Sequence, residues 1–501
     1  MELTLQRRPL CFLRCVAQTL QYQEETGETV LPDNEPDLIS VADCAAEVLL
    51  RGKDVRDGGV VVAGGVKGSI LCRTEGSAAP RTLECYLPFT IKVEHPAITE
   101  RSAVLCELRV RSADARVLNA RKALLRVSIG CALAAYQEAA ESISTLEGAC
   151  PGLEARETTL ELELPLEAGE RSFVISEALE VPAGRPPIAQ LCRCRCDAAV
   201  TERKVVGSKA LFKGTLTCKA LYRGPDDSLN QFTQSLPFSQ YCELEREYDR
   251  EQVTVLPVLT GCDVESEGGA EPRRLLLTAH VLAQCLVTGQ KTVRVVEDAY
   301  AIRGQLEPQW QTIEVSPCLD RQSRVETVQG SLSAPLSQVV DVEAYVDFPS
   351  QNRSGDGVEL KTPVLFRVLG YDGDGELQAV AAQGEALESV ALAPSADCAA
   401  RAALADGLES VAVSGGQVRC ALRLDTACFA RQALRSLASA SLEPEQEAAE
   451  RPSVILRAAS GETSLWELAK DCRSSEAAIR AVNHLEGDRL PRDAMLLIPV
   501  G

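Results

Sequence analysis

Histidine is scarce in this chain, and its scarcity excludes much enzyme chemistry. Only 3 histidines occur among 501 residues, and no Cys-x-x-Cys pair is present although the chain has 20 cysteines. A structural zinc site therefore lacks its usual ligand patterns. His95 and His484 fall in predicted turns, and His280 falls inside a predicted strand, where a structural role is far commoner than catalysis. We predict no catalytic residue, no metal and no cofactor, and hence no enzyme.

Basic residues are in the minority as well. The chain has 52 Lys and Arg against 72 Asp and Glu, which gives a net charge of −20. Binding to nucleic acid requires a basic surface that neutralises phosphates, so this balance disfavours nucleic acid as a partner. Residues 451–501 hold seven residues of each sign, so the whole acidic excess precedes them.

Long apolar runs are missing. No segment approaches the ~20 apolar residues that a membrane-spanning helix requires. The apolar patch Leu10–Val16, which follows Arg7 and Arg8, is interrupted by Arg14 and does not resemble an export signal. We expect no membrane span and a cytoplasmic location.

Cysteine, by contrast, is abundant. In a cytoplasmic protein the 20 cysteines are expected as reduced thiols rather than disulfides. Cys192, Cys194 and Cys196 alternate with arginines, which places all three on one face if this segment is a strand. We expect them to act there as small apolar residues.

The chain also repeats itself at intervals of about 150 residues. Leu31–Val41 aligns with Val181–Leu191, and at the same offset Val61–Arg73 aligns with Leu211–Arg223. A Leu-Pro-Phe sequence beginning at Leu87 recurs at Leu236. Such periodicity indicates repeated structural units. A weaker third copy begins where Pro335–Val339 resembles Pro187–Leu191, and it is expected to be degenerate.

Each repeat has the pattern of β-structure. Residues 216–222 alternate between buried and exposed residue types with one exception, as a strand does. Glycine-rich or acidic turns separate such runs, as expected for hairpins. These turns are Gly224–Asp227, Glu267–Gly269, Asp372–Gly375 and Gly415–Gly416. Frequent alanine and absent proline predict helices at Cys131–Leu146 and Cys398–Leu408.

These patterns define the expected organisation, which is a mainly β protein with a small α+β domain at its C-terminus. We expect repeats at residues 1–150, 151–320 and 321–440, the last one degenerate. A polar linker follows at residues 441–451, and a compact domain occupies residues 452–501.

The C-terminal segment predicts the order strand, helix, helix, strand. Leu465, Leu468 and Ala469 recur at helical spacing and define one buried face. Ser475 is placed to cap the second helix, in which Ile479 faces the core.

This segment resembles the LysM family over about fifty residues. The family pattern is matched by Gly461–Ala469, Ile479, Asn483–Leu485 and Leu496–Pro499. The resemblance implies a core formed by Trp466, Leu468, Ala469, Ile479, Leu496 and Ile498. It also implies a glycan- or partner-binding surface composed of Gly461, Glu462, Thr463, Ser464, Leu465, Asn483, His484, Leu485 and Leu490.

The match departs from the family pattern in its first turn. One extra residue separates Gly461 from Leu465, and Asp493 replaces a usual glycine. In LysM modules this turn and the segment after Asn483 together line the N-acetylglucosamine groove. The departures therefore shift the expectation from glycan binding towards protein docking.

The repeats are similar to the SPOCS domain of endospore-forming bacteria. The similarity is carried by the spaced prolines, the glycine-containing strand and the Leu-Pro-Phe strand, best over residues 24–112, then 174–286, and least over 326–430. This resemblance implies a spore coat morphogenesis protein in the mother-cell cytoplasm, which binds a coat morphogenetic ATPase at the forespore surface. Two alternatives remain, namely an envelope protein that binds peptidoglycan or a chitin-like glycan, and a structural coat component.

Overall fold

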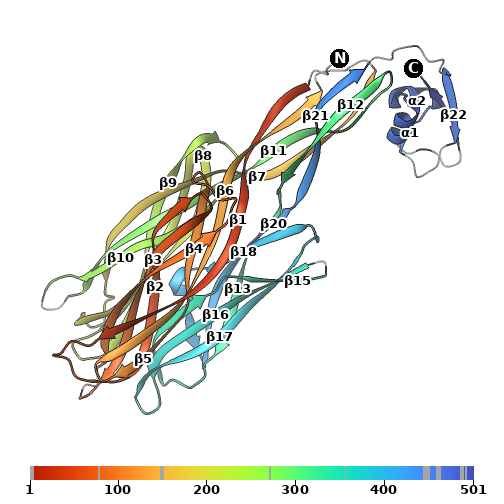
Figure 1. The fold of residues 1–501 in the computed structure, drawn as a ribbon. Coiled ribbons are helices and arrows are strands. Elements are labelled where there is room, and N and C mark those ends of the chain that lie inside the picture. The colour runs from red at the N-terminus through yellow and green to blue at the C-terminus, as the bar shows by residue number, and fades with distance from the viewer. Residues whose placement is uncertain are drawn as a thin grey trace.

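The predicted mainly β class is confirmed by a computed structural model of the chain (Figure 1). The structure describes residues 5–76, 79–146, 152–269, 272–355, 357–443, 452–458, 464–485, 490 and 494–500. Up to residue 443 the described chain is almost entirely strand, and its helices α1 and α2 lie near the C-terminus.

Residues 5–146 form the first unit, in which two antiparallel sheets share one core. The outer sheet has the order β1-β6-β5 and the inner sheet the order β2-β3-β4. Fully buried side chains such as Val62 and Ile70 of the inner sheet meet Leu125 and Ile129 of the outer sheet. The strands are β1 (Leu5–Val30), β2 (Leu38–Arg56), β3 (Gly59–Thr74), β4 (Arg81–Glu94), β5 (Ala103–Asn119) and β6 (Lys122–Leu146).

Residues 153–301 form the second unit with the same arrangement. Its outer strands have the order β10-β11-β7, and β8 pairs with β9. Strand β8 bends at Gly207, where φ is 58°, so that Thr201 Oγ1 reaches the carbonyl of Lys213. One long strand therefore covers the positions of both β2 and β3. The strands are β7 (Leu153–Glu180), β8 (Gln190–Arg223), β9 (Leu229–Tyr248), β10 (Gln252–Ser266) and β11 (Arg274–Ala301).

Residues 305–443 form the third unit. The order β13-β20-β18 corresponds to the outer sheets, and β14, β16 and β17 correspond to the inner ones. The same pairing thus recurs three times among the described residues, also where sequence similarity is weakest. The elements are β12 (Gln305–Val315), β13 (Cys318–Ser331), β14 (Gln338–Val346), β15 (Ser350–Ser354), β16 (Gly357–Tyr371), β17 (Leu377–Ala391), β18 (Ala396–Leu404), the 3₁₀ helix η1 (Gly407–Ser410), β19 (Ala412–Ser414), β20 (Gln417–Ala430) and β21 (Gln432–Glu443).

Both helices predicted from alanine content are wrong. Residues 131–146 belong to strand β6, which pairs with β1 and β5, and residues 398–404 belong to β18. Cys131, Leu133 and Ala135 alternate with less buried neighbours, as a strand between two partners requires. Tertiary pairing therefore overrides the weak helix propensity of alanine.

Three strand ribbons extend from the units and form a stalk (Figure 1). The stalk consists of residues 5–15 with 136–146, 153–166 with 287–301, and 305–315 with 432–443. Apolar side chains from different ribbons pack together, including Val296, Leu306 and Leu437. The predicted linker begins inside β21, and residues 444–451 lie outside the described residues.

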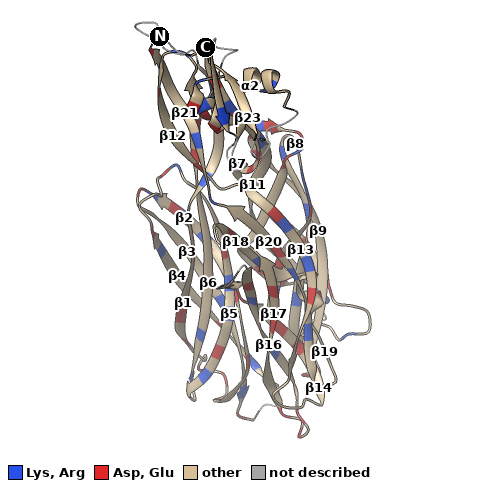
Figure 2. Ribbon diagram, turned by 90° about the vertical axis from the view of Figure 1, so that its right-hand side faces the viewer, with Lys and Arg blue, Asp and Glu red and all other residues tan. Residues whose placement is uncertain are grey.

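Charge is distributed along the units rather than gathered at one end. Figure 2 shows Lys and Arg interspersed with Asp and Glu along the strands on the side in view. Mixed charge of this kind is compatible with a solvated surface and does not form a basic stripe on that side.

A buried ion-pair network holds the three units together. Arg193 of β8 pairs with Asp43 of β2 and with Asp341 of β14, each across 2.5 Å, and these side chains are at most 8% exposed. Lys219 adds a pair to Asp341 at 3.0 Å. Burial opposes ionisation of Asp341, but Lys219 and Arg193 outweigh it and lower the pKa of this carboxyl. Buried charges are tolerated in this way only when they are paired.

Candidate functional site in the C-terminal module

The C-terminal module consists of two helices that cover a two-stranded sheet. The elements are β22 (Val454–Ala458), α1 (Leu465–Cys472), α2 (Glu476–Asn483) and β23 (Met495–Pro499). Strands β22 and β23 are antiparallel, with Leu456 opposite Leu497.

Side-chain caps begin both helices. The backbone N–H of Glu467 donates to Ser464 Oγ at 3.2 Å, and the N–H of Ser464 donates to Glu467 Oε2 at 3.1 Å, which completes a capping box. Ser475 accepts from the N–H of Ala478 at 3.1 Å, as predicted from the sequence. Helix α2 ends at His484, whose φ of 51° lies in the left-handed region.

The sequence-derived core residues gather in one cluster. Trp466, Leu468, Ala469, Ile479, Leu496 and Ile498 are all buried there. Two residues assigned to the binding surface, Leu465 and Leu490, are buried in the same cluster, and Leu485 is half-buried against it. These three apolar side chains therefore face the core of the module.

The side chain of Asn483 ties α2 to β23. Its Nδ2 donates to the carbonyl of Leu497 at 2.6 Å and to that of Ile479 at 2.8 Å, while its Oδ1 accepts the N–H of Leu497 at 2.8 Å. The amide thus pairs with Leu497 as a neighbouring strand would. Asn483, His484 and Ser464 lie at helix ends, whereas Gly461, Glu462 and Thr463 lie outside the described residues.

One face of the module packs against the stalk. The indole N–H of Trp466 donates to Asp298 Oδ2 at 2.9 Å, and Lys470 Nζ bonds the same carboxylate at 2.6 Å. The Tyr300 ring lies edge-on to Trp466 with centroids 5.0 Å apart, and its hydroxyl donates to the carbonyl of Ser474. These contacts fix the module at the tip of strand β11.

Charge at this contact is balanced locally. Burial opposes ionisation of Asp298, yet hydrogen bonds from Lys470 and Trp466 lower its pKa below the ordinary value. Burial raises the pKa of Tyr300, so the phenol stays protonated and donates to Ser474. Asp298 and Tyr300 are not identified by the sequence, because no local pattern marks a partner more than 160 residues away.

The face of the β22-β23 sheet that points away from the two helices is apolar and exposed. Val454 and Leu456 of β22 are 50% and 57% exposed, and Met495 and Leu497 of β23 are 56% and 43% exposed. Ile455 and Ile498, which alternate with them, point into the core. We call Val454, Leu456, Met495 and Leu497 the apolar sheet face; contiguous patches of this kind mark interaction sites.

The fold and this surface define a multi-unit β scaffold that carries a small module with an exposed apolar face. Residues 187–266, which cover about half of the second unit, match the protein-family description "SipL, SPOCS domain". The match connects this part of the chain with the SPOCS-domain family and supports a sporulation-related coat function. Neither a curated protein nor a solved structure matches the chain. Within the described residues, no helix is long and apolar enough to cross a membrane.

Proposed function

We propose that the protein is a non-enzymatic assembly factor of the spore coat. Its β units form a scaffold, and its stalk presents a LysM-type module that docks a protein partner at the forespore surface, in the mother-cell cytoplasm. The observation that carries the proposal is the apolar sheet face, which projects from a module held at the end of the stalk.

Two features support a LysM-type module with a sporulation role. The strand-helix-helix-strand order and the capped helices agree with the LysM resemblance of Gly461–Ala469, Asn483–Leu485 and Leu496–Pro499. The SPOCS match of residues 187–266 supports a sporulation role for the chain that carries this module. By resemblance, the partner is a coat morphogenetic ATPase.

The chemistry of the surface favours a protein over a glycan. Aliphatic side chains on a flat sheet offer few hydrogen bonds to sugar hydroxyls, and the amide of Asn483 is already bonded to Leu497 and Ile479. A second copy of the chain is also a poor partner, because each copy carries a net charge of −20 and the two repel.

The test combines a deletion with matched point variants of a fluorescent fusion in a sporulating host. We expect deletion of residues 452–501, or the pair Leu456→Ser and Leu497→Ser, to disperse the fusion from the forespore. Leu118→Ser changes a 40%-exposed leucine of the first unit and serves as the control. Such surface changes alter stability by only about 0.5 kcal/mol. Unchanged forespore localisation and coat assembly in the double variant contradict the proposal.

Two further measurements separate the alternatives. Tight binding of chitin oligomers that survives Leu456→Ser supports the glycan-binding envelope protein instead. Polymerisation of the purified protein alone, followed by sedimentation, supports the structural coat component. Our proposal expects neither result.

A further inference from the structure

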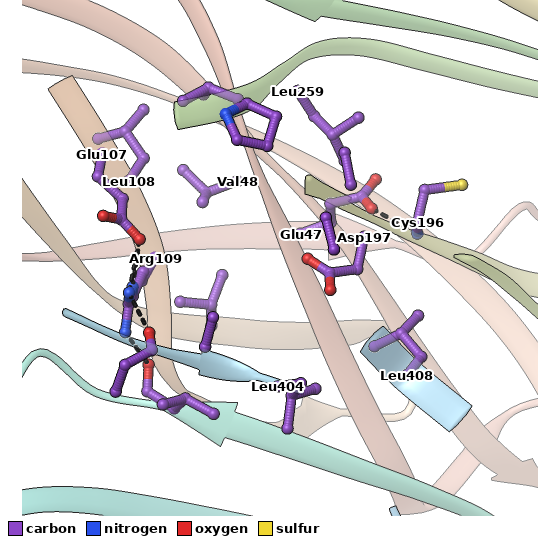
Figure 3. Close-up of a pocket in the computed structure, with 18 of the residues that line it drawn as sticks. Glu47, Val48, Glu107, Leu108, Arg109, Cys196, Asp197, Leu259, Leu404 and Leu408 are labelled. Carbon is purple, nitrogen blue, oxygen red and sulfur yellow. Dashed lines mark hydrogen bonds and ion pairs between the residues drawn. The ribbon is translucent and has the colours of Figure 1, made fainter. Parts of the chain in front are cut away.

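A cavity lies where the three units meet. Its volume is about 190 Å³, and its lining comes from β2 and β5 of the first unit, β8 and β10 of the second, and β14 and β18 of the third (Figure 3). This volume lies below the ~300 Å³ at which pockets for drug-sized ligands begin, so any occupant is small.

Equivalent residues of the three inner strands meet at this cavity. Glu47, Asp197 and Tyr345 occupy the same repeat position on β2, β8 and β14. The N–H of Cys196 donates to Glu47 Oε1 at 2.8 Å, and the N–H of Ala46 donates to the Tyr345 hydroxyl at 3.3 Å. Glu47 and Tyr345 therefore each satisfy a backbone amide of another unit.

Two carboxylates at the cavity retain free acceptor capacity. Glu47 is only 7% exposed, and its Oε2 has no hydrogen-bond partner in the described part of the chain. Asp197, which is only partly buried, forms no hydrogen bond or ion pair with any described residue. Figure 3 shows both carboxyl groups on the same side of the cavity. A buried carboxylate without a partner is costly, which indicates that a donor belongs there.

The arginines of the lining do not supply that donor. Arg109 and Arg401 both pair with Glu107. Burial alone would raise the pKa of this carboxyl, but the two arginines outweigh burial and lower the pKa to about 2. The other engaged arginines form the pairs Arg195–Glu343 and Arg423–Asp425. Arg203 has no ion-pair partner among the described residues, and its exposed side chain adds an unneutralised positive charge to the lining.

The rest of the wall is largely apolar. It includes Val48, Leu108, Val258, Leu259, Leu404 and Leu408. Magnesium and calcium require about six or more oxygen ligands, and the two carboxylates with free acceptor capacity do not provide them. An ammonium group with a short hydrocarbon chain matches both parts of the wall, because it donates up to three hydrogen bonds and carries apolar surface.

We propose that this cavity binds a short aliphatic primary amine. Its ammonium group bonds to Glu47 Oε2 and to the Asp197 carboxylate, and its hydrocarbon chain packs against the leucines. The unpaired charge of Arg203 disfavours a second cationic group, so a monoamine binds more tightly than a diamine of the same length. This site is independent of the docking function proposed for the C-terminal module.

Isothermal titration of the full chain with n-butylamine at pH 8 tests the proposal. We expect saturable binding of n-butylamine, weaker binding of 1,4-diaminobutane, and no binding of 1-butanol or butyrate. Glu47→Gln and Asp197→Asn should each weaken the affinity roughly tenfold or more, the scale of one hydrogen bond to a charged group. Glu202→Gln, which changes an exposed carboxylate on β8, should leave the affinity unchanged.

Circular dichroism and melting curves verify that the variants fold. If Glu47→Gln does not fold, Asp197→Asn alone provides the test. Absence of n-butylamine binding by the wild-type chain overturns the proposal. Equal affinity of wild-type protein and Asp197→Asn overturns it as well. Binding of butyrate in preference to n-butylamine assigns the cavity to anions and has the same consequence.

Discussion

Trp466 and Asp298 are joined by a hydrogen bond of 2.9 Å that connects helix α1 of the C-terminal module to strand β11 of the stalk. Lys470 approaches the same carboxylate, and Tyr300 covers the indole ring from the side. The module is therefore held in a defined orientation, in addition to being attached through the preceding segment of chain.

Removing the Tyr300 ring should loosen this contact. In a Trp310→Phe background, Trp466 is the sole tryptophan, because the chain has 2. We expect Tyr300→Ala to increase acrylamide quenching of Trp466 fluorescence and to shift its emission to longer wavelength, since the indole loses its buried neighbour. Tyr86→Ala, a half-exposed tyrosine in the first unit, is the control and should leave both signals unchanged. Equal quenching in both variants contradicts the contact.

The buried Arg193 should be essential to the association of the units. Arg193→Ala leaves Asp43 and Asp341 buried with fewer partners, so we expect the free energy of unfolding to fall by about 3–5 kcal/mol. Arg246→Ala breaks only an exposed pair with Glu138 and should cost less than about 1 kcal/mol. Urea titration followed by circular dichroism measures both. Similar losses in the two variants rule out a special role for the buried network.

Stability should depend on pH through Glu47. Burial raises the pKa of this carboxyl to about 7, above the model-compound value of 4.5, against lowering contributions from the Cys196 N–H, Arg195 and Lys67. The folded state therefore holds a proton that the unfolded state releases between these two pH values, and stability falls as pH rises through this window. The negative charge of Glu343 adds to the effect of burial.

Glu47→Gln should abolish that pH dependence. The shift corresponds to about 3 kcal/mol, so the variant should gain up to about this amount over wild type at pH 8 and little at pH 4.5. Urea unfolding at the two pH values provides the measurement. A wild-type chain whose stability rises over this interval, with no difference from the variant, contradicts the prediction.

Substitutions at two adjacent residues at the end of α2 should have opposite effects on the stability of the module. Asn483→Ala removes the hydrogen bonds to Leu497 and should destabilise the module by about 1–3 kcal/mol. His484→Gly relieves a left-handed residue and should stabilise it by about 1 kcal/mol. Trp466 fluorescence in a thermal ramp reports on the module. If Asn483→Ala leaves the melting temperature of the module unchanged, the amide does not tie the helix to β23.

Local patterns in the sequence predict much of the β structure but not its long-range partners. The predicted turn at Gly224–Asp227 does join β8 to β9, and Leu216 and Tyr222 do alternate into the core of the second unit. The alanine content of residues 131–146 predicts a helix where β6 lies, because the strand partners that make this segment a strand lie up to about 140 residues away in the chain. Local propensity contains no information about such pairing.

The candidate site is likewise predictable from the sequence only in part. Helical spacing identifies Leu468 and Ile479 as buried, because their core is formed within one short segment. Asp298 and Tyr300 belong to a strand that precedes the module by more than 160 residues, so spacing within the module cannot reveal them. The exposure of the leucines of β22 and β23 also required the structure, since a continuous apolar run such as Met495–Ile498 can be buried on both faces.

Asp43, Arg193 and Asp341 occupy one repeat position in three copies, yet one copy differs in sign from the other two. Three separate copies of the second unit could not assemble in this way, because three arginines would meet where one now lies between two aspartates. The same repulsion applies to three copies of the first unit. The charge at a single position therefore distinguishes the second unit from the other two, and the assembly requires one arginine-bearing unit between two aspartate-bearing units.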